Sequence, residues 1–200
     1  MTTQRINVAR ALARRTLISS LLLAALGSPA FAQTSASVSV SAEDTRAELD
    51  TALPQHRLVG KGRLTVWGFQ VYDARLWALP SFKPGNLTAQ PFALELSYLR
   101  DFASRDIAER SITEMRRSAD INESQAKAWT YEMQRVIPDI KKGDRVMGIH
   151  RPGAGAQLLI NGKASGEIRD AEFARLFFGI WLSPQTSEPK VRLALLAGAL

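Results

Sequence analysis

The chain has 200 residues, a net charge of +7 and no cysteine, which excludes disulfides, iron–sulfur clusters and thiol catalysis. Four arginines and no acidic residue lie before Gln33, so residues 33–200 carry 22 basic against 19 acidic side chains, a net charge of +3. A charge this small gives no case for a nucleic-acid partner.

The first 32 residues have the order of charges and apolar residues that is typical of a secretory signal peptide. Arginines precede the apolar run Leu17–Leu26, and Ala30-Phe31-Ala32 follows as a cleavage site. We therefore predict a signal peptide over 1–32, cleaved near Ala32-Gln33, and a periplasmic or otherwise exported protein. A flexible leader over 33–47 and a folded domain over 48–197 follow. No later apolar run is long enough for a transmembrane segment in the mature chain.

A stretch rich in β-branched and aromatic residues, Leu58–Leu79, predicts two strands that turn near Gly68. Alternation places Tyr72 on one face with Ala74 and Leu76. A tyrosine on an apolar face either holds the polar end of a ligand or is a buried phenol with a backbone partner.

A third strand, Pro91–Arg100, carries an apolar stripe that ends in Tyr98 and Arg100 on one side. This is typical of a cleft wall with a polar group at its mouth, and equally of an ordinary strand that leaves the core for solvent. If Arg63 and Tyr72 converge with these two residues, the four form an anion-binding corner in an apolar cleft.

The rest of the chain predicts helices that begin near Ser104 and Asn122, then a strand over Arg145–His150. Asn161-Gly162 is the preferred two-residue turn of a hairpin, and two more helices begin near Asp170 and Ser187. Because strands do not alternate with helices, we expect an α+β fold with a largely antiparallel sheet covered by helices.

The sequence lacks the usual catalytic and phosphate-binding motifs: G-x-S-x-G, H-E-x-x-H, a P-loop, and G-x-G-x-x-G opening a helix. Its two histidines, His56 and His150, have no neighbour at metal-ligand spacing. We therefore predict no catalytic residue, no metal site and no cofactor.

The pattern Gly60-x-Gly62…Gly68-Phe69-x-Val71-Tyr72-x-Ala74-x-Leu76-Trp77 resembles a signature of the chalcone isomerase and fatty-acid-binding protein superfamily. The later segments follow in matching order as far as Phe177–Leu182, and the likeness is greatest to the bacterial, exported chalcone isomerase-like branch. It covers nearly the whole mature chain, about 49–196. The resemblance implies an open-faced β-sandwich with a ligand cleft between its sheet and its helices.

Specific positions of this family can be matched to the chain. Tyr72 matches a tyrosine that helps hold the carboxylate in the fatty-acid-binding members, and Arg100 matches a lysine of the isomerases. Without a gap, Leu64 falls where the binding members have an arginine, so Arg63 reaches the cleft only if a bulge near Gly62 corrects the register. The segment Phe102–Arg110 lacks the tyrosine that the isomerases have there.

Three functions follow from the resemblance. The first is a non-catalytic protein that binds a fatty acid or a similar amphipathic anion. The second is an isomerase (an intramolecular lyase) acting on a chalcone-like phenolic compound, which the missing tyrosine and the displaced arginine disfavour. The third is a structural or interaction module of the cell envelope, whose cleft is closed by four aromatic residues: Trp67, Trp77, Trp129 and Phe177. No protein partner can be named.

Overall fold

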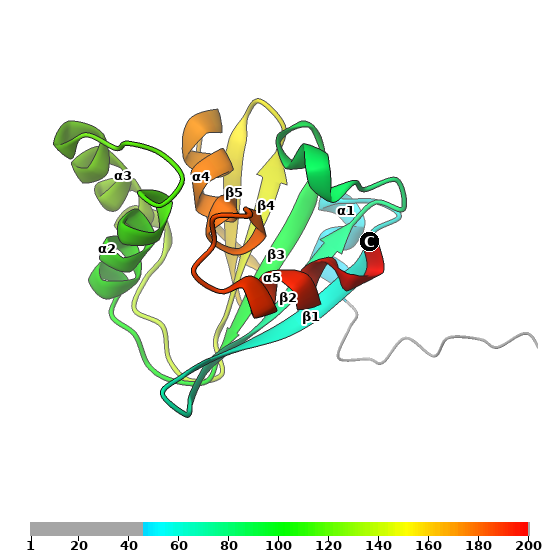
Figure 1. Ribbon diagram of the computed structural model, residues 1–200, viewed down its shortest axis with the longest axis horizontal. Helices are drawn as coiled ribbons and strands as arrows, with labels where there is room; N and C mark the ends of the chain where they lie inside the picture. Colours follow the sequence, from blue (N-terminus) through cyan, green and yellow to red (C-terminus); the bar gives the residue numbers. More distant parts are fainter. Residues whose placement is uncertain (1–45, 200) are drawn as a thin grey trace, which may run out of the picture. The chain divides into compact units, whose positions relative to one another are not determined.

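One six-stranded sheet organises the computed structural model, which describes residues 46–199 (Figure 1). Each strand pairs antiparallel with its neighbour in sequence, in the order β1 to β6. The strands are β1 (Arg57–Val66), β2 (Phe69–Ala78), β3 (Phe92–Tyr98), β4 (Arg145–Arg151), β5 (Gly155–Ile160) and β6 (Lys163–Ile168). The predicted signal peptide, and the leader up to residue 45, lie outside the described residues.

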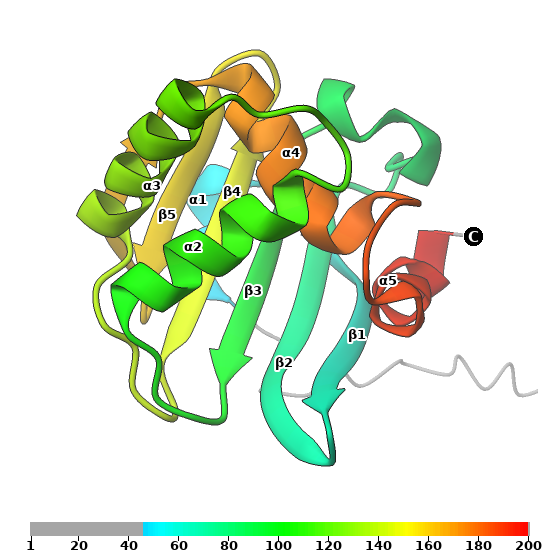
Figure 2. The same ribbon diagram turned by 60° about the vertical axis from the view of Figure 1, so that its left-hand side comes forward.

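Helices cover one face of this sheet, as Figure 2 shows for α2, α3 and α4, while α5 lies along β1. Their bounds are α1 (Ala47–Ala52), α2 (Ser104–Met115), α3 (Glu123–Val136), α4 (Ala171–Leu182) and α5 (Pro189–Leu196), with 3₁₀ segments η2 (Pro84–Ala89) and η3 (Ala197–Ala199). The predicted α+β class and the open-faced β-sandwich are confirmed. Within residues 46–199, no helix combines the length and apolar character needed to cross a bilayer.

The alternation of β2 places Tyr72, Ala74 and Leu76 on one face, as predicted, and the structure has a core on each side of the strand. Tyr72, Ala74 and Leu76 pack in the large core beneath the helices. Trp77 points the other way, into a smaller core that α1 covers with Leu49. A strand whose two faces are both buried is anchored from both sides, which fixes the orientation of Tyr72.

Turns and caps define where the elements end. Asn161 and Gly162 have φ values of 50° and 80° in the β5–β6 turn, as the hairpin prediction requires. The side chains of Asn122 and Asp170 cap α3 and α4 by accepting bonds from backbone N–H groups. Ser104 does not cap α2 with its side chain, which donates instead to the carbonyl of Ile137.

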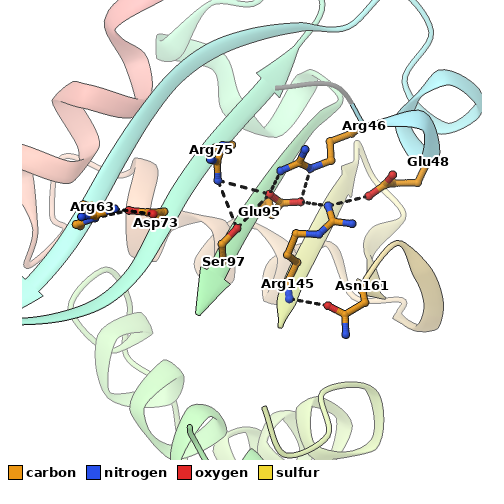
Figure 3. A network of polar contacts seen from close by, with 9 residues as sticks. All are labelled: Arg46, Glu48, Arg63, Asp73, Arg75, Glu95, Ser97, Arg145 and Asn161. Carbon is orange, nitrogen blue, oxygen red and sulfur yellow. Dashed lines mark hydrogen bonds and ion pairs between the residues drawn. The ribbon is translucent and has the colours of Figure 1, made fainter. Parts of the chain in front are cut away.

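A buried ion-pair network holds α1 against the face of the sheet opposite α2, α3 and α4 (Figure 3). Glu95 of β3 is fully buried and accepts two hydrogen bonds from Arg46, at 2.8 Å and 2.7 Å, and one from Arg145 at 2.7 Å. Burial by itself would raise the pKa of Glu95, but the hydrogen bonds and charges of the two arginines outweigh it and lower this pKa. The carboxylate therefore stays ionised and joins the residue preceding α1 to β3 and β4.

Candidate functional site: a cavity between sheet and helices

A cavity of about 710 Å³ lies between the sheet and the helices α2 and α4. Its wall is mostly apolar, with Leu64 and Leu96 on the strands, Ile107 on α2 and Phe177 on α4. Its size and character fall within the range of small-molecule sites, which is roughly 300–1,000 Å³.

Three of the four predicted site residues line this cavity: Tyr72, Tyr98 and Arg100. Tyr72 and Tyr98 are paired across β2 and β3, and their rings meet edge to face with centroids 5.9 Å apart. Arg100 follows β3, and its guanidinium carbon lies 5.0 Å from the ring centroid of Phe69. The sheet register thus brings a cation and two phenols to one cavity.

Tyr72 already has a side-chain partner. The indole Nε1 of Trp181, on α4, donates to its hydroxyl oxygen at 2.8 Å. Burial raises the pKa of Tyr72 to about 12, so the phenol remains protonated at neutral pH. Because the oxygen accepts from Trp181, the proton of Tyr72 is left for donation to another group.

Tyr98 is buried as well, and burial raises the pKa of its phenol. Among residues 46–199 its hydroxyl has no hydrogen-bond partner, although its ring packs edge to face on Phe102 with centroids 5.4 Å apart. The cavity wall therefore carries two neutral phenols, each able to donate a proton to a ligand oxygen.

Arg63 does not line the cavity, so the expectation that it converges with Tyr72, Tyr98 and Arg100 is wrong. Its Nε lies 2.5 Å from Oδ1 of Asp73, the residue opposite it on β2, on the sheet face that carries the Glu95 network (Figure 3). The register of β1 shifts between Leu58 and Gly60 and again after Leu64, but it is continuous from Gly60 to Leu64. No bulge beside Gly62 therefore rotates Arg63 inward, and Leu64 lines the cavity instead.

The charged side chains that line the cavity are only partly paired, since Asp106 and Glu188 form no ion pair within residues 46–199. Glu114 on α2 forms an ion pair with Arg110 at 2.6 Å, and Asp101 forms one with Lys141 at 3.1 Å. Arg100, in contrast, has no carboxylate partner in the part of the chain that the structure describes. The lining contains two arginines, and Arg110 is paired with Glu114, so within residues 46–199 Arg100 is the one available to an anionic ligand.

The aromatic residues expected to close the cleft do not fill it. Trp77 lies on the other face beneath Arg46, whose guanidinium carbon is 5.2 Å from its ring centroid. Trp129 donates to Asp170 at 2.9 Å, away from the cavity. Trp67 and Phe177 do line the cavity, but Trp67 is 94% exposed at its edge.

Sequence reasoning overlooked Trp181 and Phe69 as parts of the site. Trp181 lies in the segment Phe177–Leu182 that supported the family resemblance, but nothing in its spacing indicated a bond to Tyr72, 109 residues away. Phe69 belongs to the same family pattern as Tyr72, but nothing in the sequence indicated its contact with the guanidinium of Arg100. Over residues 46–199, no group of three or more His, Cys, Asp or Glu side chains is placed to hold a metal ion.

The fold and the sequence both have known counterparts. The crystal structure of a fatty-acid binding protein of Arabidopsis thaliana, AtFAP1, superposes with a TM-score of 0.55 at 13% identity, covering 72% of this chain and 88% of that one. An uncharacterized protein of Haemophilus influenzae is 28% identical over 139 residues, which are 69% of this chain and 66% of that relative. The sequence model of the chalcone isomerase-like family matches residues 38–197, and the chain therefore belongs to that family.

Proposed function

We propose that this protein, once exported, binds a fatty acid or a similar amphipathic anion in the cavity and does not transform it. The observation that carries the proposal is an apolar cavity of about 710 Å³ with an unpaired guanidinium, that of Arg100, in its lining. Two neutral phenols, Tyr72 and Tyr98, add hydrogen-bond donors to the same wall.

The two ends of such a ligand would gain energy from different parts of the site. An acyl chain gains about 0.8 kcal/mol for each methylene that it buries against the apolar wall. A carboxylate gains charge-assisted hydrogen bonds from Arg100, and it is disfavoured on the α2 side, where the carboxylate of Asp106 also lines the cavity. We therefore place the head group near Arg100 and the acyl chain among the apolar side chains. The fatty-acid binding protein AtFAP1, which shares the fold, supports this class of ligand.

The absence of catalysis is inferred from the groups in the wall. Leu64 lines the cavity where an arginine would be needed to stabilise a phenolate, and Phe102–Arg110 contains no tyrosine. The raised pKa of Tyr72 keeps its phenol protonated, so it is a hydrogen-bond donor and a poor base at neutral pH.

The test compares two ligands of equal chain length, a fatty acid and the corresponding fatty alcohol, titrated into delipidated protein. We expect saturable binding with a preference for the acid. Arg100→Gln should weaken acid binding about three- to tenfold and remove that preference, because one charge-assisted contact at a partly solvated position is lost. The matched control is Arg63→Gln, which removes the same charge from the opposite face and should leave both affinities unchanged.

Binding that is equally indifferent to both arginine variants would rule out the proposed head-group site. Failure of either ligand to bind would leave the cavity without this function and favour a structural role. Consumption of a chalcone above the spontaneous rate, followed by its absorbance, would contradict the non-catalytic part of the proposal.

A further inference from the structure

The turn between β1 and β2 carries an exposed apolar cluster, which we call the hairpin tip: Val66, Trp67, Gly68 and Phe69. Trp67 is 94% exposed, Phe69 60% and Val66 37%. Of the five large hydrophobic residues exposed within residues 46–199, three are therefore contained in four consecutive positions, and the other two are Tyr131 and Leu193. Clustered exposure of this kind marks an interaction surface more often than single exposed residues do.

The backbone of the hairpin tip gives a second reason to look for a partner. Trp67 has a φ of 49° and Gly68 a φ of 83°, the left-handed conformation of a two-residue hairpin turn. Asn, Asp or Gly is preferred at the first of these positions, whereas a bulky side chain is strained there. Because Trp67 is almost fully exposed, packing within the described fold does not compensate for this strain.

The hairpin tip is continuous with the cavity. Val66, Trp67 and Phe69 all line it, so the exposed apolar surface passes without interruption into the apolar wall. Figures 1 and 2 both show the hairpin tip projecting beyond the rest of the sheet, at the end where the segments after β3 and before β4 also turn. A flat apolar surface can therefore contact the hairpin tip at this end without contacting the helices.

Cations border the same end of the sheet. Arg100 lies against Phe69. The backbone N–H of Lys142 donates to Asp101 at 2.8 Å, which places Lys142 next to the residue that follows Arg100. Neither Arg100 nor Lys142 has a carboxylate partner for its side chain among residues 46–199, whereas Asp101 is paired with Lys141. Tryptophan at the level of the head groups, flanked by cations that meet phosphates, is the pattern of proteins that contact a membrane surface.

We propose that the hairpin tip inserts into the surface of an anionic phospholipid bilayer, with Trp67 and Phe69 at the head-group boundary. Arg100 and Lys142 then face lipid phosphates, and the cavity opens toward the bilayer. This docking goes beyond the proposed ligand function and is measured without any fatty acid, so the two proposals can fail separately.

The position of the tryptophans makes the full chain suitable for a direct test. The sequence has four tryptophans, none before Trp67, and the other three are at most 7% exposed. Quenching of tryptophan fluorescence by nitroxide-labelled lipid therefore reports on Trp67, whatever the N-terminal segment does. With vesicles of phosphatidylcholine and phosphatidylglycerol, we expect strong quenching of the wild-type chain, and weaker quenching when phosphatidylglycerol is omitted.

The matched control moves the exposed indole to another surface. Trp67→Asn places a residue that suits the turn at the tip, and Tyr131→Trp in that background exposes an indole on α3. This double variant should show at least a fivefold smaller quenched fraction than the wild type. Equal quenching in both chains, or none in the wild type, would overturn the proposal. Burial of Trp67 that rises with protein concentration in the absence of vesicles would also overturn it, because the tip would then meet a second copy of the chain.

Discussion

At the scale of single residues, the hydroxyl of Tyr72 can form two kinds of hydrogen bond, one within the cavity wall and one to a ligand. Its hydroxyl accepts a bond from Trp181, which satisfies an indole N–H that would otherwise be left unpaired at the cavity. The phenol proton remains available because burial keeps the pKa of Tyr72 high. Arg63 and Leu64 make the complementary point: one position along a strand decides whether a side chain reaches the cavity or the opposite face.

Glu95 is a buried acid whose ionisation contributes to the dependence of stability on pH. Its pKa is lowered below the ordinary value of 4.5, so the ionised form stabilises the folded chain above that pH. This contribution should be lost progressively as the pH falls below 4.5, because the unfolded chain then binds a proton that the folded chain still excludes. The bonds to Arg46 and Arg145 are the physical origin of the effect.

We predict that Glu95→Gln lowers the free energy of unfolding at pH 7 by about 3 kcal/mol, since it removes the charge that compensates two buried or half-buried guanidinium groups. In urea unfolding, the difference from wild type should shrink steadily below pH 4.5. The control is Glu172→Gln, which breaks an exposed pair with Arg175 and should cost no more than about 1 kcal/mol. A pH-independent difference for Glu95→Gln would show that the effect arises from packing and not from ionisation.

At the scale of elements, the contact between β1 and α5 depends on a glycine. A Cβ built at Gly60 would lie 2.5 Å from the carbonyl oxygen of Leu195, and it would overlap that of Ala194 as well. At Gly62 the nearest atoms are Cγ1 and the carbonyl oxygen of Val191, both at 3.3 Å. The G-x-G pattern of β1 thus permits the close approach of the last helix to the edge strand of the sheet.

We predict that Gly60→Ala lowers the free energy of unfolding by about 2 kcal/mol, because the backbone of α5 must move away from β1. Gly62→Ala should cost less, since its nearest neighbours at 3.3 Å need to shift by only a few tenths of an ångström. Gly85→Ala, with no atom within 4 Å of the new Cβ, should be close to neutral. The denaturation midpoints of the three variants test this order, and an equal loss at Gly60 and Gly85 would contradict it.

At the scale of the whole molecule, the two faces of the sheet differ in how completely they are filled. The side covered by α1 is closed by Trp77 and the Glu95 network, whereas the side covered by α2 and α4 retains about 710 Å³ of space. This space opens to solvent at the end of the sheet where the exposed residues Trp67 and Phe69 line it. A ligand can therefore enter it without unfolding of the layers.

We predict that filling the cavity weakens ligand binding strongly and leaves the fold intact. Ile107→Trp adds bulk from the α2 wall and should weaken fatty-acid binding at least tenfold, while the free energy of unfolding changes by no more than about 1 kcal/mol. Leu193→Trp adds an indole on exposed α5, outside the cavity, and should leave the affinity unchanged. Wild-type affinity in a folded Ile107→Trp variant would show that the ligand binds elsewhere.

Local patterns in the sequence were sufficient for the α+β class, the two faces of β2 and the Asn161-Gly162 hairpin, because alternation and turn chemistry act over a few residues. They also placed Tyr72 and Tyr98 on the inner faces of their strands and Arg100 on the same side as Tyr98, although β3 ends at Tyr98. The bond between Tyr72 and Trp181, the exclusion of Arg63 and the volume left between the layers were decided only by the tertiary structure. Those features depend on strand register and on the distance between helices and sheet, and both are set by the packing of residues that lie far apart in the chain.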